Sequence, residues 1–144
     1  MSVERKAETN VKQALPFFQV RDINASLRFY VDALGFRLTN QWVHEGRLRW
    51  CCLKLDDVSL MLQEFWSEGH HRNLPDGEVG VGVSIYFECA DALKLYRQFR
   101  SCGLDAKRPF VGNGLWNVGI KDPDGYNLSF GSPTDAPEES EYSE

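Results

Sequence analysis

The chain repeats one order of sequence patterns, and this repeat constrains its fold more than any other feature. Each copy opens with a strand-like apolar run, continues with an amphipathic helical segment, and closes with three further strand-like runs. The glycines that end the helical segments, Gly35 and Gly103, lie 68 positions apart, and the aspartates that precede these segments, Asp22 and Asp91, lie 69 apart. A repeat of this length is too long for a solenoid unit. We therefore predict two equivalent βαβββ modules and an α+β fold class.

The two modules account for most of the chain. We expect them at about residues 15–66 and 79–132, which together form a single domain over 15–132. The segment 67–78 between them is polar and contains glycine and proline, so we expect a linker there. Residues 1–14 are polar and mixed in charge, which indicates a flexible N-terminal arm.

The charge of the chain is concentrated at its C-terminal end. The 144 residues include 16 Lys and Arg and 21 Asp and Glu, which gives a formal net charge of −5. Five of the acids lie in residues 133–144, so the rest of the chain is formally neutral. A neutral body lacks the basic excess that binds nucleic-acid phosphates. The acidic tail contains two prolines and no apolar run, and we expect it to be disordered.

The cysteines and the N-terminal sequence indicate a reducing compartment. Cys51, Cys52, Cys89 and Cys102 form no CxxC motif and no disulfide-dense spacing. The adjacent Cys51 and Cys52 point to opposite faces of a strand and are not expected to pair. The N-terminus has no apolar stretch typical of a secretory signal, and no apolar run approaches the ~18 residues of a membrane span. We expect a reduced, cytoplasmic protein with no membrane partner.

Two segments near the ends of the repeat resemble the signatures of a known family. LPFFQVRDINASLRFYVDALGFRL, residues 15–38, is similar to the opening signature of the vicinal oxygen chelate superfamily. IKDPDGYNLSFGSP, residues 120–133, is similar to its closing signature. This superfamily includes glyoxalase I, extradiol dioxygenases and bleomycin-resistance proteins. The resemblance implies curved mixed sheets around a cavity with helices on the convex side. It also implies a homodimer, because members commonly complete the cavity by pairing modules within or between chains.

The resemblance also implies where a metal ion would be bound. Metal-dependent members place one ligand on each of four strands, and these positions fall on Leu15, Met61, Ser84 and Ser129. A divalent cation needs imidazole, carboxylate or amide oxygen ligands, and none of these four side chains supplies one. We therefore expect no metal and no other cofactor, as in the bleomycin-resistance-like branch.

The remaining motifs do not indicate a catalytic centre. His44 lies in a predicted hairpin turn and His70 and His71 lie in the linker, where we expect all three to be solvated. Gly80 and Gly82 precede a strand and do not connect a strand to a helix, so they lack the context of a phosphate-binding loop. The spacing suggests no Ser/His/Asp or Cys/His arrangement, and we assign no catalytic residue.

Strand alternation selects the candidate ligand-binding residues. Side chains of one parity along each strand point away from the apolar set and toward the cavity. The parity of two tryptophans stays open, because both faces of their strands contain apolar residues. The candidates combine aromatic rings with a few polar groups, which is the usual composition of a small-molecule site. They are Phe17, Gln19, Trp50, Met61, Gln63, Ser84, Tyr86, Glu88, Trp116, Asn127 and Ser129.

These observations favour a metal-free protein that binds or sequesters a flat or aromatic small molecule, as in antibiotic resistance. Stacking on indole rings would supply affinity, and the polar groups would set orientation. One alternative is a lyase, isomerase or dioxygenase-like enzyme with non-standard catalytic groups, for which Glu88 and Tyr86 are a pair capable of proton transfer. The other alternative is a dimeric interaction module with a vestigial cavity.

Overall fold

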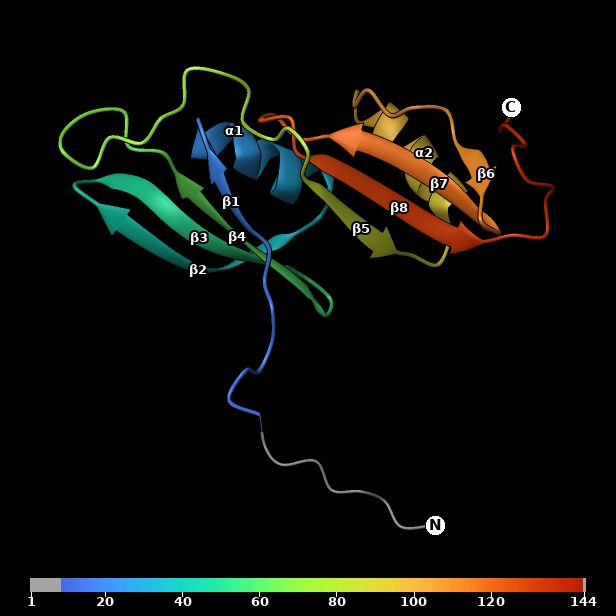
Figure 1. The fold of residues 1–144 in the computed structure, drawn as a ribbon, viewed down its shortest axis with the longest axis horizontal. Helices are drawn as coiled ribbons and strands as arrows, with labels where there is room; N and C mark the ends of the chain where they lie inside the picture. The colour runs from blue at the N-terminus through green and yellow to red at the C-terminus, as the bar shows by residue number, and fades with distance from the viewer. Residues whose placement is uncertain (1–8, 144) are drawn as a thin grey trace, which may run out of the picture.

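The computed structural model describes residues 9–143, which form two modules of the same build (Figure 1). The first module contains β1 (Phe17–Val20), α1 (Ile23–Leu27), the π-helical turn η1 (Arg28–Ala33), β2 (Arg37–His44), β3 (Arg47–Leu55) and β4 (Val58–Glu64). The second contains β5 (Ser84–Glu88), α2 (Ala92–Ser101), β6 (Phe110–Gly112), β7 (Leu115–Lys121) and β8 (Asn127–Pro133). The predicted α+β fold of two tandem βαβββ modules is confirmed.

Each module builds one four-stranded mixed sheet. The strand order is β1-β4-β3-β2 in the first sheet and β5-β8-β7-β6 in the second. In both sheets the first strand pairs in parallel with the last, and the other pairs are antiparallel. The shared topology explains why the sequence repeats at a constant interval.

One helix covers one face of each sheet and buries its apolar side chains. On the first sheet, Leu53 and Leu62 are buried where α1 packs on β3 and β4, and on the second, Val118 and Leu128 are buried where α2 packs on β7 and β8. All four residues belong to one core cluster that spans both modules. Because side chains alternate along a strand, the other residues of each sheet face away from the helices. We call that side the open face.

An aspartate begins each helix. Oδ1 of Asp22 accepts hydrogen bonds from the backbone N–H of Asn24 at 3.0 Å and of Ala25 at 3.2 Å. Oδ1 of Asp91 accepts one from the N–H of Lys94 at 3.0 Å. These bonds satisfy N–H groups that have no partner inside the helix. Asp22 is therefore the N-cap of the first helix.

The two modules meet through β1 and the turn between β7 and β8. The ring of Phe18 stacks on that of Tyr126, with centroids 4.0 Å apart and planes 7° from parallel. The Tyr126 hydroxyl donates to the carbonyl oxygen of Gln19 at 2.9 Å. These contacts fix the second module against the β1 edge of the first sheet.

Two further segments of the chain contain no regular secondary structure. The predicted linker, residues 67–78, contains no helix or strand. Of the predicted N-terminal arm, residues 9–14 are exposed and form no helix or strand, and residues 1–8 lie outside the described part of the chain. No helix within residues 9–143 is both long and apolar enough to cross a membrane.

The C-terminal segment differs from the predicted disorder, because residues 134–143 follow the edge of the second sheet (Figure 1). The N–H of Val111 donates to the carbonyl oxygen of Ser140 at 2.9 Å, and the N–H of Glu139 donates to the carbonyl oxygen of Val111 at 2.8 Å. The segment therefore covers backbone groups of β6 that would otherwise stay unpaired at a sheet edge.

A single aromatic side chain explains why the acidic segment is ordered. The Tyr142 ring packs edge-on against Tyr96, with centroids 5.7 Å apart, and against Trp116, at 6.3 Å. Its hydroxyl accepts a hydrogen bond from Arg97 at 3.3 Å. Aromatic burial of this kind favours an ordered segment. The prediction of disorder relied on the charge of the segment and gave this tyrosine too little weight.

Candidate functional site

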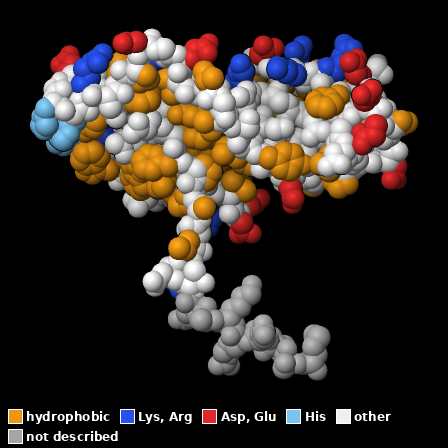
Figure 2. Space-filling view, in the orientation of Figure 1, with side chains coloured by type: hydrophobic (Ala, Val, Ile, Leu, Met, Phe, Trp, Pro, Cys, Tyr) orange, Lys and Arg blue, Asp and Glu red, His pale blue; other side chains and the backbone are white. Residues whose placement is uncertain are grey.

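Each sheet places its predicted site residues, except Trp116, on its open face. The pairing registers show this directly, since residues that lie opposite one another in neighbouring strands share a face. Hydrophobic side chains gather at the lower left of Figure 2, where Figure 1 places β2 and β3, whereas charged side chains line the upper rim. The predicted residues on the open face are Phe17, Gln19, Trp50, Met61, Gln63, Ser84, Tyr86, Glu88, Asn127 and Ser129.

Large side chains dominate the open face of the first sheet. Trp42 lies opposite Trp50, and Trp50 lies opposite Gln63, so two indoles and an amide form one row across β2, β3 and β4. Phe17 lies opposite Met61 in the adjacent row. Phe17 is 48% exposed and Trp42 is 46% exposed. A group of exposed aromatic side chains on one sheet face is typical of an interaction or ligand site.

Trp42 is a candidate site residue that sequence reasoning missed. The register between β2 and β3 shifts twice, once next to Trp42 itself, so simple alternation along β2 fails. The signal that could have found it is the hairpin register, which pairs Trp42 with Trp50.

Small and polar side chains form the open face of the second sheet. Ser84 lies opposite Asn127, Tyr86 opposite Ser129, and Glu88 opposite Gly131. Tyr86 is 47% exposed and is the large aromatic residue of this set. The first sheet therefore offers apolar rings, and the second offers hydroxyl, amide and carboxylate groups.

The structure shows on which face of its sheet each of the two tryptophans, Trp50 and Trp116, lies. Arg49 and Cys51, the neighbours of Trp50, are buried on the helix side, so Trp50 itself lies on the open face. Trp116 lies opposite Val111, which is buried, and it packs against Tyr142 at the α2 side of the second sheet. Trp116 therefore belongs to the core that holds the C-terminal segment, and we remove it from the proposed site.

A groove of about 470 Å³ runs between the two sheets. Its apolar walls include Leu15 and Val58, and its polar groups include Tyr86, Glu88 and Asp57. The described residues that line it include no Lys or Arg. The groove thus joins candidate residues of the second module to the segment that precedes β1.

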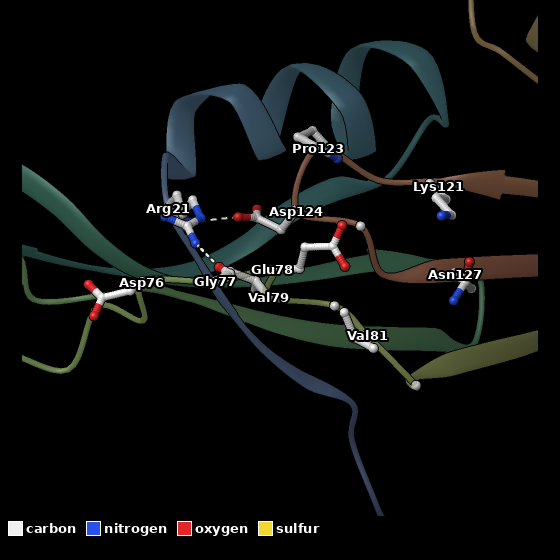
Figure 3. A pocket seen from close by; sticks show the side chains of 13 residues that line it. Arg21, Asp76, Gly77, Glu78, Val79, Val81, Lys121, Pro123, Asp124 and Asn127 are labelled. Carbon is white, nitrogen blue, oxygen red and sulfur yellow. Dashed lines mark hydrogen bonds between the residues drawn. The ribbon is translucent and has the colours of Figure 1, made fainter.

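Figure 3 shows a second cavity, of about 720 Å³, between the linker and the β7–β8 turn. Here the backbone N–H of Arg21 donates to Oδ1 of Asp124 at 2.9 Å, and its guanidinium donates to the carbonyl oxygens of Pro75, at 3.3 Å, and of Gly77. Burial raises the pKa of the Asp124 carboxyl, and the hydrogen bond from Arg21 opposes this shift. These polar groups already satisfy one another, so the cavity forms part of the junction between the modules.

The close approach of two backbones explains one glycine at this junction. The N–H of Gly80 donates to the carbonyl oxygen of Asp124 at 2.9 Å. A side chain on Gly80 would overlap the backbone of Gly125 and Tyr126. Glycine is needed there for packing, in agreement with the absence of a phosphate-loop context.

A buried ion-pair network lies on the helix side of the first sheet, and the sequence patterns did not reveal it. Glu64 is 2% exposed, and its Oε1 accepts hydrogen bonds from Arg49 at 2.9 Å and from Arg47 at 2.7 Å. Its Oε2 accepts from the N–H of Ile23 at 3.0 Å. Arg49 also lies over the Trp66 ring, 3.8 Å from its centroid. This network anchors the start of α1 and does not reach the open face.

The sequence model of the glyoxalase/bleomycin resistance protein/dioxygenase superfamily matches residues 12–130, which is most of the chain. The chain belongs to this superfamily. No curated protein matches it in sequence.

Solved structures share the fold of this superfamily member over nearly their whole length. TnmS3, an antibiotic binding protein from Streptomyces sp. CB03234, is 16% identical with a TM-score of 0.65, and the match covers 88% of this chain and 100% of that one. A lactoylglutathione lyase from Agrobacterium tumefaciens is 18% identical with a TM-score of 0.61, covering 86% and 96%. A glyoxylase/bleomycin resistance protein/dioxygenase domain from Frankia sp. EAN1pec is 18% identical with a TM-score of 0.67, covering 88% and 100%. At these identities the likeness concerns the fold alone.

The metal positions of the superfamily do not fit a metal in this chain. Leu15 precedes β1, and Met61, Ser84 and Ser129 lie on the open face. An aliphatic group, a thioether and two hydroxyls are poor ligands for nickel, zinc or iron. Within residues 9–143, no group of three or more His, Cys, Asp or Glu side chains is arranged to hold a metal ion.

The histidines of this superfamily member lie at the outer end of the first module. His44 stacks on Trp42 with centroids 5.2 Å apart, and the rings of His70 and His71 lie 3.9 Å apart. All three side chains are exposed, as the sequence predicted.

Proposed function

We propose that this protein binds a flat, aromatic small molecule on its open face, without a metal ion. The observation that carries the proposal is the pair Trp42 and Trp50, two indoles directly opposite each other on a face that no helix covers. Indole rings bind flat ring systems by stacking. The hydroxyl and amide groups of the second sheet would fix the polar edges of the ligand.

The charge of the protein favours a ligand of low net charge. Outside residues 133–144 the chain has equal numbers of acidic and basic side chains. The groove between the sheets contains Asp57 and Glu88, which would tolerate a single cationic substituent on a largely apolar molecule. A strongly cationic ligand would require a larger acidic excess.

Sequestration of such a ligand requires the open face to be covered, and we propose that a second copy of the chain covers it. Phe17, Trp42 and Tyr86 are each close to half exposed. A face of this kind gains stability when a partner removes it from water. Light scattering should give about twice the chain mass of 16.5 kDa. A species of 16.5 kDa at micromolar concentration would contradict the homodimer.

A role in antibiotic binding is part of this proposal. TnmS3, whose fold this chain shares, is described as an antibiotic binding protein, and an aromatic open face suits such a ligand. We also propose a reducing, cytoplasmic setting, since Cys51, Cys52, Cys89 and Cys102 are free thiols.

An enzyme is the second candidate, and one juxtaposition favours it. Tyr86 and Glu88 lie on the same face of β5 and line the same groove, so a phenol and a carboxylate could share a proton transfer. Turnover of a bound compound in metal-free buffer, lost in Glu88→Gln, would favour this candidate over simple binding.

The first test is a thermal-shift screen of compounds built on naphthalene, acridine and phenanthridine rings, including proflavine and 8-anilinonaphthalene-1-sulfonate. A ligand that binds only the folded state raises its melting temperature by linkage. We expect flat polycyclic compounds to raise it and aliphatic compounds of similar mass to leave it unchanged. A panel in which no aromatic compound raises the melting temperature would contradict the proposed function.

A further inference from the structure

Tyr86 and Gly131 form an unusual contact on the open face of the second sheet. A Cβ atom built on Gly131 would lie 2.9 Å from Cζ of Tyr86 and 3.0 Å from Cε1, and it would overlap the phenol oxygen. These separations are too short for any real side chain. The tyrosine ring therefore occupies the space where every other residue type would carry its own side chain.

The contact shows how the ring lies on the sheet. Tyr86 is in β5 and lies opposite Ser129, whereas Gly131 is two residues farther along β8, on the same face. The side chain must therefore reach diagonally across β8 to bring its hydroxyl above Gly131. A side chain in a strand usually stands roughly perpendicular to the sheet. Tyr86 instead lies along it, with 47% of its surface exposed.

Backbone conformation does not explain the glycine at position 131. Its φ angle lies outside the left-handed region in which glycine is favoured, unlike those of Gly35 and Gly103. Gly131 lies within β8, and its carbonyl oxygen accepts a hydrogen bond from the N–H of Cys89 at 2.9 Å. Alanine would therefore suit this backbone. The methyl group of that alanine would, however, overlap the Tyr86 ring.

We propose that Gly131 is a positioning residue for Tyr86, and that the flat tyrosine ring is the stacking platform for a planar ring of the ligand. This inference rests on the proposed function, which it extends to the second sheet. A tyrosine ring held over the sheet in this way can accept a planar ring stacked on it. Within the described residues the Tyr86 hydroxyl makes no hydrogen bond to another group. It is therefore available to an oxygen or nitrogen atom on the edge of a planar ligand.

The chain offers a matched control for this contact. Gly119 also lies opposite Ser129 on the open face. A Cβ there would meet only the carbonyl oxygen of Leu128, at 4.0 Å. Gly119→Ala and Gly131→Ala therefore add the same methyl group to the same sheet face, and only the second meets the tyrosine ring.

The position of the ring is tested by ¹⁹F NMR of the full chain labelled with 3-fluorotyrosine. The Tyr86→Phe variant identifies the Tyr86 signal by its loss. Gly131→Ala should move this signal toward the value of a solvent-exposed tyrosine, and Gly119→Ala should leave it in place. An unmoved signal in Gly131→Ala, with the protein folded, would overturn the positioning role.

The platform role is tested with proflavine as the probe, by fluorescence titration. Gly131→Ala should weaken binding by about twofold to tenfold, the range expected for the loss of one aromatic stacking contact. Tyr86→Ala should weaken it similarly, and Gly131→Ala should then add no further loss in the Tyr86→Ala background. An equal further loss in that background would overturn the inference.

Two further outcomes separate this inference from the proposed function. Wild-type protein that binds no proflavine and no 8-anilinonaphthalene-1-sulfonate would contradict the proposed function. Proflavine affinity that is unchanged in both Gly131→Ala and Tyr86→Ala would contradict only the stacking role of Tyr86. If Gly131→Ala folds poorly alone, its melting temperature should recover when Tyr86→Ala removes the overlapping ring. Failure to recover would again overturn the positioning role.

Discussion

The phenol oxygen of Tyr30 lies 2.7 Å from Oδ2 of Asp122, and this buried hydrogen bond joins the first helix to the second module. Tyr30 is 0% exposed and Asp122 is 5% exposed. The other carboxylate oxygen of Asp122 accepts from the N–H groups of Asp124 and Tyr126, each at 2.9 Å. One side chain therefore holds both the β7–β8 turn and the junction between the modules.

Removal of the Tyr30 hydroxyl should destabilise the protein without changing its fold. Tyr30→Phe leaves one oxygen of the buried Asp122 carboxyl without its partner, and we expect a loss of about 1–3 kcal/mol in the free energy of unfolding. Urea unfolding measures it. Tyr96→Phe is the control, because Tyr96 is also buried and its hydroxyl has no hydrogen bond within the described residues. Equal losses in the two variants would contradict the role of the Tyr30–Asp122 bond.

The same pair predicts how stability depends on alkaline pH. Burial, reinforced by the Asp122 carboxyl, raises the pKa of Tyr30 well above its ordinary value of 10. The unfolded chain then releases this proton at a lower pH than the folded chain, so stability decreases as pH rises above 10. Tyr30→Phe should reduce that decrease by up to about 1.4 kcal/mol per pH unit. Urea unfolding between about pH 9 and 11 tests it, and parallel slopes for the two proteins would contradict the pKa shift.

Trp50 and Trp116 should respond differently to the same substitution. Trp50→Ala removes a ring from the open face, so it should weaken proflavine binding and change the melting temperature little. Trp116→Ala removes a ring that packs against Tyr142, so it should cost about 2 kcal/mol of stability and leave proflavine affinity unchanged. Titration and thermal melting of both variants measure the two effects. Reduced affinity in Trp116→Ala alone would contradict the assignment of faces.

Truncation after Pro133 should lower the melting temperature, because it removes Tyr142 and the backbone bonds to β6. It should also lower the solubility, because it removes all five acidic side chains of the segment. Tyr142→Ala removes the packing and keeps every charge of the segment, so it separates the two effects. We expect this variant to reproduce most of the loss of stability but none of the loss of solubility. A melting temperature that stays constant in both variants would show that the segment does not pack on the domain in solution.

The repeat was sufficient to predict the module order, and alternation was sufficient to predict most faces. Both succeed because helix and strand periods are local properties of the sequence. Parity alone thus places Phe17 and Met61 on one face of the first sheet, and these two residues lie directly opposite each other in β1 and β4.

The failures have physical reasons that lie outside local patterns. Trp116 stands in a strand with apolar residues on both faces, and only its contact with Tyr142 decides its side. Trp42 lies next to a register shift that changes its parity. Glu64 is charged yet buried, because two arginines and a helix N–H from elsewhere in the chain satisfy it. Each depends on a tertiary contact that no window of sequence contains.

Metal-free stacking of a ligand on the open face is best tested by calorimetric titration of proflavine into wild-type protein and Trp50→Ala, both dialysed against a chelator. We expect the wild-type protein to bind proflavine without metal and with no gain in affinity from added nickel or zinc, and we expect Trp50→Ala to weaken binding at least severalfold. Binding that appears only after metal is added, with equal affinity in Trp50→Ala, would contradict metal-free stacking on the open face.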